Sequence, residues 1–228
     1  MADFNFNHQQ YWDSTLHELV GTDERDVITG SITTGDSMWA SLRGGNDFAR
    51  IWSGEINFVN GNWGEDILEV SYVDSDTGVV TGYGGIFLGG RDNDLLSVFS
   101  GTVASINGNR GNDKVWGLSG AYAMFRGGQD NDQLGVANGL VYGDKGNDAF
   151  LMMPPSSNAS EYAWVKDYTP GEDSVYYAPS LGSFSHFANS SGLWLYQNNN
   201  ATMLLEGISS VDQVNLIATD NILTQDVI

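Results

Sequence analysis

The sequence predicts an all-β solenoid, in which short parallel strands stack coil upon coil. Two observations carry this prediction. A glycine- and aspartate-rich motif recurs through residues 21–152 at a nearly constant interval, and apolar residues alternate with others after each copy, as they do in strands. We therefore expect three regions: an N-terminal cap at residues 1–20, the repeat at 21–152, and a mixed-β capping region at 153–228.

The recurring motif is Gly-X-X-Gly/Asp-X-Asp. Five close copies and two looser ones end at Asp26, Asp47, Asp66, Asp94, Asp113, Asp132 and Asp148. From Asp47 onwards the successive intervals are 19, 28, 19, 19 and 16 residues. These intervals indicate a 19-residue coil with an insertion near Val73–Thr81 and a shortening before Asp148. A second column of glycines, including Gly54, Gly101 and Gly120, keeps the same register and argues against a chance pattern.

Each coil should contain a loop, a strand, a tight turn and a return strand. Apolar residues two and four places after the final aspartate, such as Leu68 and Val70, predict the first strand. The segments Thr102–Ile106 and Ala121–Phe125 are typical return strands. Both faces of the return strands are largely apolar, so the sequence does not say which face is the core.

Which face of the return strands is exposed matters for function. One set of return-strand residues includes Ala40, Val59, Ala104, Ile106, Ala123 and Phe125, and the alternate set includes Trp39, Phe58, Ile86, Ser105 and Met124. If the first set is core, the second forms an exposed apolar face, which is typical of a protein contact unless the cap segments cover it. Two other candidate contact surfaces are the inserted loop around Asp74–Gly78 and a basic row of Arg91, Arg110 and Lys145, which could equally balance nearby acidic charge.

The amino-acid composition limits the classes of partner that the chain could bind. The 228 residues include 29 acidic and 9 basic side chains, for a formal charge of −20. This charge argues against nucleic acid and anionic membrane and favours a cationic partner, with dissolved metal the first candidate. The chain has no cysteine, so disulfides are excluded, and no apolar run approaches the ~20 residues of a transmembrane segment. The N-terminus does not resemble a cleaved signal peptide.

The repeat resembles the RTX family of hemolysin-type calcium-binding repeats, whose consensus is Gly-Gly-X-Gly-X-Asp-X-U-X with U apolar. The resemblance covers roughly residues 21–152. It implies a right-handed parallel β-roll or β-helix with several calcium ions, roughly four to six, between successive loops on one edge. The implied side-chain ligands are the final aspartates Asp26, Asp47, Asp66, Asp94, Asp113, Asp132 and Asp148.

Glycines let the backbone turn so that loop carbonyls face one point, and the next coil supplies a second set of ligands. The remaining implied metal-site residues are Gly89, Arg91, Asp92, Gly108, Arg110, Gly111, Gly127, Gln129, Asp130, Gly143, Lys145 and Gly146. In the C-terminal region, which resembles the segment after the repeats in RTX exoproteins, Asp173 and Asp167 could bind one further calcium or simply cap turns.

The pattern departs from typical RTX rolls, because only one edge carries aspartate and the coil has 19 residues. It is similar in this to the RTX coils of a bacterial ice-binding adhesin. In that relative, outward threonine and asparagine of the loop meet ice. Here the asparagine persists, but the threonine place holds Trp63, Arg91, Arg110, Gln129 and Lys145, which argues against ice binding.

The ends carry weaker signals. Helical spacing of Tyr11, Trp12, Leu16, Leu19 and Val20, after a possible N-cap at Asp13 or Ser14, predicts a helical N-terminal cap. Farther on, the sequence predicts a hairpin of Leu193–Gln197 with Thr202–Leu205 and a short helix at Ser209–Val214. The terminal Gln225–Ile228 resembles the uncleaved type I secretion signal of the family, or is a final strand edge.

We expect no enzyme. His17-Glu18 begins a zinc-binding His-Glu-X-X-His pattern, but Gly21 stands where the second histidine is needed. The expected protein is an extracellular calcium-binding structural protein that folds on calcium and self-associates as a homo-oligomer or polymer, in a surface layer, matrix fibre or virion appendage. It would be secreted without a cleaved signal peptide or released with a virion. The alternative is a calcium-dependent adhesin or glycan-binding module with a glycan or protein receptor; an ice-binding protein or a small enzyme is a more remote one.

Overall fold

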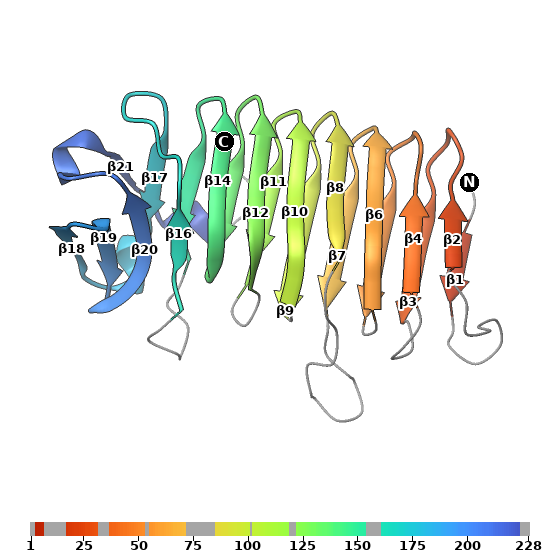
Figure 1. Ribbon diagram of the computed structural model, residues 1–228, viewed down its shortest axis with the longest axis horizontal. Helices are drawn as coiled ribbons and strands as arrows, with labels where there is room; N and C mark the ends of the chain where they lie inside the picture. Colours follow the sequence, from red (N-terminus) through yellow and green to blue (C-terminus); the bar gives the residue numbers. More distant parts are fainter. Residues whose placement is uncertain are drawn as a thin grey trace.

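The computed structural model describes residues 3–6, 17–31, 37–52, 55–71, 85–100, 102–118, 122–153 and 161–223. The chain alternates between two sheets that face each other across one core (Figure 1). Among these residues, one sheet has ten strands, all parallel, and the other has eleven, of which β18 and β19 are joined antiparallel at one end. The predictions of an all-β fold and of parallel, stacked coils are therefore confirmed.

The ten-stranded sheet contains, in spatial order, β1 (Asp3–Phe6), β3 (Val27–Ser31), β5 (Phe48–Trp52), β7 (Ile67–Ser71), β9 (Leu95–Ser100), β11 (Lys114–Gly117), β13 (Gln133–Val136), β15 (Ala149–Met152), β17 (Ser174–Tyr177) and β21 (Asn215–Ala218). The eleven-stranded sheet contains β2 (His17–Val20), β4 (Ser37–Ser41), β6 (Glu55–Trp63), β8 (Ile86–Arg91), β10 (Thr102–Arg110), β12 (Tyr122–Gln129), β14 (Gly139–Lys145), β16 (Ala163–Val165), β20 (Asn200–Glu206), β19 (Gly192–Gln197) and β18 (Phe184–Asn189). Strands β10 and β12 run farther than the sequence predicted, into the glycine-rich loops.

Equivalent residues of successive coils stack in the core. Leu68, Leu96, Val115 and Leu134 pair in register in the ten-stranded sheet, and all are buried. Because strand side chains alternate between faces, this register turns a repeat in sequence into continuous apolar columns. Gly117 has a specific role, since a Cβ there would collide with the buried ring of Phe125.

The return strands now have a defined inner face. Ala40, Val59, Ile106, Ala123 and Phe125 are buried, so this set is the core. The alternate set points outward and continues in register across seven neighbouring strands, until it reaches the buried Leu204 of β20. We call this row the apolar stripe; it consists of Trp39, Phe58, Ile86, Ser105, Met124, Leu140 and Trp164. Figure 1 views this sheet from the front, with the ten-stranded sheet behind it.

The N-terminal prediction was wrong where it can be compared. Residues His17–Val20 form strand β2 and pair in parallel with β4, whereas helical spacing had predicted a helix through Leu19 and Val20. Pairing with the exposed edge of the next coil overrides the local spacing, because strand preference depends on the neighbouring strand. The other cap residues, from Tyr11 to Leu16, lie outside the described residues.

The C-terminal region keeps the parallel pattern beyond residue 152, because β16 pairs with β14 and β17 pairs with β15. The predicted hairpin is present as β19 and β20, with Asn198 and Asn199 at positive φ in its turn. The predicted short helix is the 3-10 turn η2 (Val211–Gln213), closed by a capping box between Ser210 and Gln213. Two further 3-10 turns are η1 (Pro179–Leu181) and η3 (Asp220–Leu223).

Two predicted segments, the insertion Val73–Thr81 (which includes Asp74–Gly78) and the terminal Gln225–Ile228, lie outside the described residues. Within the described ranges, no helix is long and apolar enough to span a bilayer.

Candidate metal centre

All the aspartate loops lie along one edge of the slab, where each strand of the eleven-stranded sheet leads into the next strand of the other sheet (Figure 1). In the loops from residue 42 to residue 148, the second and fourth motif positions both adopt a left-handed backbone. One of the two is always glycine. Where Gly90 takes the second position, Asp92 takes the fourth; where Asn109 takes the second, Gly111 takes the fourth.

This compensation explains why the fourth position alternates between glycine and aspartate. Glycine adopts a left-handed backbone without steric cost, and asparagine and aspartate tolerate it better than other residues. The rule was not predicted, although the sequence shows it as an exchange of glycine between the two positions.

The final aspartates form a buried ladder along the stack. Each of the eight is at most 3% exposed: Asp26, Asp47, Asp66, Asp94, Asp113, Asp132, Asp148 and Asp173. The Oδ1 atom of each, from Asp47 onwards, accepts a hydrogen bond from the backbone N–H of the aspartate one coil earlier, as Asp113 does from Asp94 at 2.8 Å. The motif aspartates are therefore brought together in one row, as the sequence predicted, and Asp173 is its last member.

The second carboxylate oxygen behaves differently in the middle and at the ends of the ladder. At the ends, Asp26 Oδ2 accepts from the Thr22 N–H at 2.6 Å and Asp173 Oδ2 accepts from the Thr169 N–H at 2.7 Å. In the middle, the buried Oδ2 atoms have no hydrogen-bond donor; they belong to Asp47, Asp66, Asp94, Asp113 and Asp132. Buried oxygens of this kind cost folding free energy unless something satisfies them.

Two of these orphaned oxygens, on Asp66 and Asp94, lie in small cradles that also contain a carbonyl oxygen. A Cβ added to Gly61 would collide with both Asp66 Oδ2 and the carbonyl oxygen of Gly89 in the next coil. A Cβ added to Gly89 would likewise meet Asp94 Oδ2 and, at 2.8 Å, the carbonyl oxygen of Gly108. A carboxylate and a carbonyl from successive coils therefore converge on the space that the missing side chain leaves.

Burial dominates the acid–base properties of the ladder. Desolvation raises the pKa of Asp66 to about 8 and that of Asp94 and Asp132 to about 9. The same cause raises the pKa of Asp113 and Asp148 to about 7. The pKa of Asp47 is raised to about 6. The hydrogen bond from the neighbouring backbone works in the opposite direction in every case, but it does not offset the loss of water.

The other predicted ligand residues fall into two groups. Gly89, Gly108, Gly127 and Gly143 each lie against the Oδ2 of their own loop's aspartate and so line the cradles. Gly111 and Gly146 instead lie against the carbonyl oxygens of Asp92 and Asp130. The side chains of Arg91, Arg110, Gln129 and Lys145 are exposed, so these residues could contribute only backbone carbonyls.

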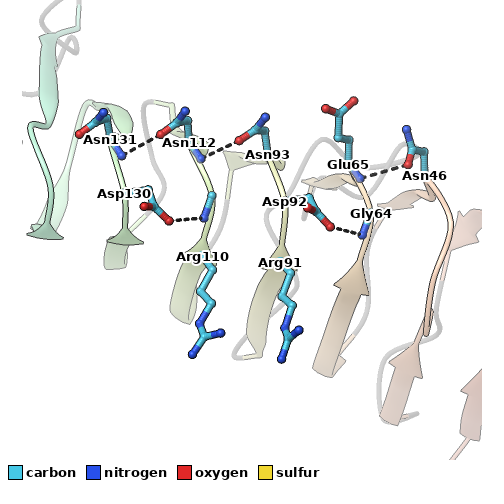
Figure 2. A pocket seen from close by; sticks show the side chains of 11 residues that line it. Asn46, Gly64, Glu65, Arg91, Asp92, Asn93, Arg110, Asn112, Asp130 and Asn131 are labelled. Carbon is cyan, nitrogen blue, oxygen red and sulfur yellow. Dashed lines mark hydrogen bonds between the residues drawn. The ribbon is translucent and has the colours of Figure 1, made fainter.

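The remaining acidic candidates are held by hydrogen bonds. Asp92 Oδ2 accepts from the Gly64 N–H at 3.2 Å, and Asp130 Oδ2 accepts from the Gly111 N–H at 3.3 Å (Figure 2). Asp167 accepts from the N–H groups of Gly143 and Asp144, both at 3.0 Å. Asp173 caps its own turn through the Thr169 N–H, which was one of the two roles predicted for it, whereas Asp167 ties its loop to strand β14 of the preceding coil.

The loop asparagines form a second, exposed ladder (Figure 2). Asn93 Oδ1 accepts from the Asn112 N–H at 2.7 Å, Asn112 from Asn131 at 2.9 Å and Asn131 from Asn147 at 2.8 Å. Each asparagine Oδ1 accepts from an N–H of the following coil, whereas each aspartate Oδ1 accepts from an N–H of the preceding coil. Each loop is thus tied to both of its neighbours, a role for asparagine that was not predicted from the sequence.

Among the described residues, no three His, Cys, Asp or Glu side chains gather as a metal site would require. A cation held here would need backbone carbonyls beside each carboxylate. The chain as a class is a parallel β-solenoid with a buried aspartate ladder along one edge. No family model matches its sequence, and the comparison with curated proteins found no match.

Proposed function

We propose that this chain is an extracellular calcium-binding structural protein, whose coils are ordered by calcium held between successive loops. The observation that carries the proposal is the row of buried Oδ2 atoms that lack a donor, two of which, on Asp66 and Asp94, share a cradle with a carbonyl of the next coil. The RTX resemblance of the motif points the same way. The proposed ligands are the ladder aspartates from Asp47 to Asp132, together with loop carbonyls such as those of Gly89 and Gly108.

Calcium suits this chemistry better than other cations. It accepts six to eight oxygen ligands in flexible geometry, including backbone carbonyls, whereas magnesium keeps several of its waters and needs an octahedral site. The candidate ligand atoms here are all oxygens, and the carboxylate Oδ2 atoms are buried away from solvent. When bound, calcium would compensate the negative charge of these buried carboxylates.

The competing interpretation is that the aspartates only cap turns. Turn capping accounts for Oδ1, which accepts a backbone N–H in each coil. It does not account for the second oxygen. At the two ends of the ladder this oxygen has a backbone donor, and in the middle it has none. That contrast favours a bound cation in the middle of the stack.

The proposed setting is outside the cell, where calcium is abundant enough to fill weak sites. In a calcium-poor cytosol the carboxylates would repel one another and leave the chain loose enough for export. The proposed role is structural and requires no catalysis, and the protein would act as a self-associated assembly.

Glycan binding is the less favoured alternative. Sugar rings stack on open aromatic faces, but several aromatic faces here already carry a cation. Arg91 lies 4.9 Å from the Trp63 ring centroid, Lys166 lies 4.0 Å from Trp164, and Arg126 lies 5.0 Å from Tyr142.

The substitution Asp113→Asn tests the calcium proposal, because it keeps the Oδ1 acceptor and removes the buried charge. We expect calcium to raise the Tm of the wild type by roughly 10 °C or more. In chelator, D113N should unfold at the wild-type temperature or above, since it removes a desolvated carboxylate. In millimolar calcium it should unfold below the wild type. Thermal unfolding followed by circular dichroism measures both.

The matched control is Asp23→Asn, which makes the same charge change at an exposed loop residue and should keep the wild-type calcium response. Magnesium in place of calcium should give a much smaller shift. If wild-type Tm is equal in chelator and in calcium, calcium binding is wrong and the ladder is a turn-capping device.

A further inference from the structure

The apolar stripe is an unusual surface for so acidic a chain. Trp39 is 44% exposed and Ile86 is 42% exposed, and the residues between Trp39 and Trp164 continue the row without a gap in register. The row beside it begins with Ser41, Asn60 and Leu88 and continues through Asn107, Arg126 and Tyr142. Neither row contains an acidic residue between β4 and β14.

Two acids that border this face are neutralised. Asp144 is ion-paired with Arg126, and Glu206 is ion-paired with Lys166. A third acid, Glu18 of β2, is exposed and lies in register with Trp39 at the end of the row. Elsewhere the formal charge of −20 opposes the approach of any second copy. A face with no unpaired acid in these two rows is therefore one on which two copies can meet without that repulsion.

The order of residues along the stripe is close to a palindrome. Reading from β4 to β16, it runs Trp39, Phe58, Ile86, Ser105, Met124, Leu140 and Trp164. A two-fold axis parallel to the strands and centred on Ser105 would bring Trp39 of one copy to Trp164 of the other. The same axis would pair Phe58 with Leu140 and Ile86 with Met124. Self-complementarity of this kind is what a two-fold interface requires, because every contact in it occurs twice.

The size of the overlap fits a weak dimer. With the axis at Ser105, the stripes of two copies overlap over the seven strands from β4 to β16. At a spacing of ~4.8 Å, with two rows of side chains, these strands give a footprint of roughly 450 Å² per copy. The total of roughly 900 Å² is in the range of weak, transient protein–protein interfaces.

The aromatic groups favour a protein rather than a sugar on this face. Trp39 and Phe58 stack on each other, with ring centroids 5.3 Å apart and an interplanar angle of 26°. The Trp164 ring carries the Lys166 ammonium. Rings packed or covered in this way do not offer the separate open faces on which sugar rings stack.

We propose that the apolar stripe is the contact surface for a second copy of this chain, joined face to face about a two-fold axis. This inference rests on the self-association in the proposed function, but not on calcium binding. Each dimer would leave both aspartate-loop edges free, and its strands would pack sheet on sheet at roughly 10 Å separation.

The test compares Ile86→Lys with Ile67→Lys. Ile67 is the matched control, because it is 37% exposed on the outer face of the ten-stranded sheet, away from the stripe. Sedimentation velocity across a protein dilution series, in millimolar calcium, gives the mass and the dissociation constant. We expect the wild type to form dimers, I86K to weaken them roughly tenfold or more, and I67K to leave them unchanged. Circular dichroism confirms that both variants fold.

The outcomes separate the two proposals. A calcium-dependent Tm together with a wild-type monomer at every concentration overturns the dimer and leaves calcium binding intact. A wild-type dimer that I86K does not weaken, or that both variants weaken equally, places self-association on another surface. Adding Met124→Glu to I86K should recover part of the lost affinity, because the two-fold axis brings these positions together; absence of recovery contradicts the proposed axis.

Discussion

At the scale of a single residue, the glycine that opens each loop makes room for two oxygens. The backbone of Gly89 does not need a left-handed conformation, so alanine there carries little backbone strain. Its Cβ would nevertheless enter the space shared by Asp94 Oδ2 and the carbonyl of Gly108. We expect Gly89→Ala to lower the free energy of unfolding in calcium by about 2 kcal/mol or more, and to reduce the Tm gain from calcium. Urea unfolding with and without calcium measures both.

Gly44→Ala is the control for this substitution. It is also a loop glycine, but the nearest atom to its added Cβ would be 3.8 Å away, an ordinary contact distance. Its stability should stay within about 0.5 kcal/mol of the wild type. A wild-type calcium response in G89A would mean that the cradle beside Asp94 does not hold the ion.

The ladder aspartates were predictable from the sequence, whereas their surroundings were not. The fixed interval between them requires equivalent positions in successive coils, so a single row of carboxylates follows from the period alone. Which oxygen would find a donor depends on the positions of neighbouring N–H groups. The donors for Asp26 and Asp173 at the two ends come from Thr22 and Thr169, and no residue in the repeat signals that the middle lacks them.

At the scale of the element, the asparagine ladder contributes to the stacking of the loops separately from the metal site. Asn112→Ala removes the acceptor for the Asn131 N–H and leaves the N–H of residue 112 bonded to Asn93. Because this edge is exposed, water can replace the lost acceptor, and we expect a loss of about 1 kcal/mol in the free energy of unfolding. The Tm gain from calcium should not change. Urea unfolding measures the first quantity and thermal unfolding the second; a reduced calcium response would instead assign Asn112 to the metal site.

Element boundaries show where sequence reasoning succeeds in a solenoid. The strands after each aspartate were predictable because every coil repeats the same apolar spacing, and the neighbouring coil selects the register that buries it. The return strands were ambiguous because Trp39 and Phe58 are as apolar as the core residues Ala40 and Val59. Only the pairing of complete coils decides between these faces. The segment that forms β2 was predicted as the end of a helix, because its four residues, His17–Val20, are too few to distinguish the helical period from the strand period.

At the scale of the whole molecule, protons and calcium should substitute for each other. The pKa of each ladder aspartate from Asp47 to Asp148 is raised by burial, to between about 6 and about 9, above the ordinary value of 3.8. Between about pH 4 and about pH 9, the folded, metal-free chain therefore binds more protons than the unfolded chain. The contribution of these groups to the free energy of unfolding is fully present below about pH 4, and it is lost as pH rises towards about 9.

Metal-free protein should consequently unfold at a temperature roughly 10 °C or more higher at about pH 5 than at about pH 8. In saturating calcium the difference should shrink or reverse, since calcium competes with protons for the same oxygens and binds better as they leave. Thermal unfolding of dialysed protein across this pH range, with and without calcium, measures both trends. D113N, which has one fewer titrating group in the ladder, should show a shallower decline in the metal-free series. Metal-free stability that rises with pH would mean that the buried carboxylates are charged and satisfied without a cation, and both the ladder's acid–base behaviour and the calcium proposal would have to be abandoned.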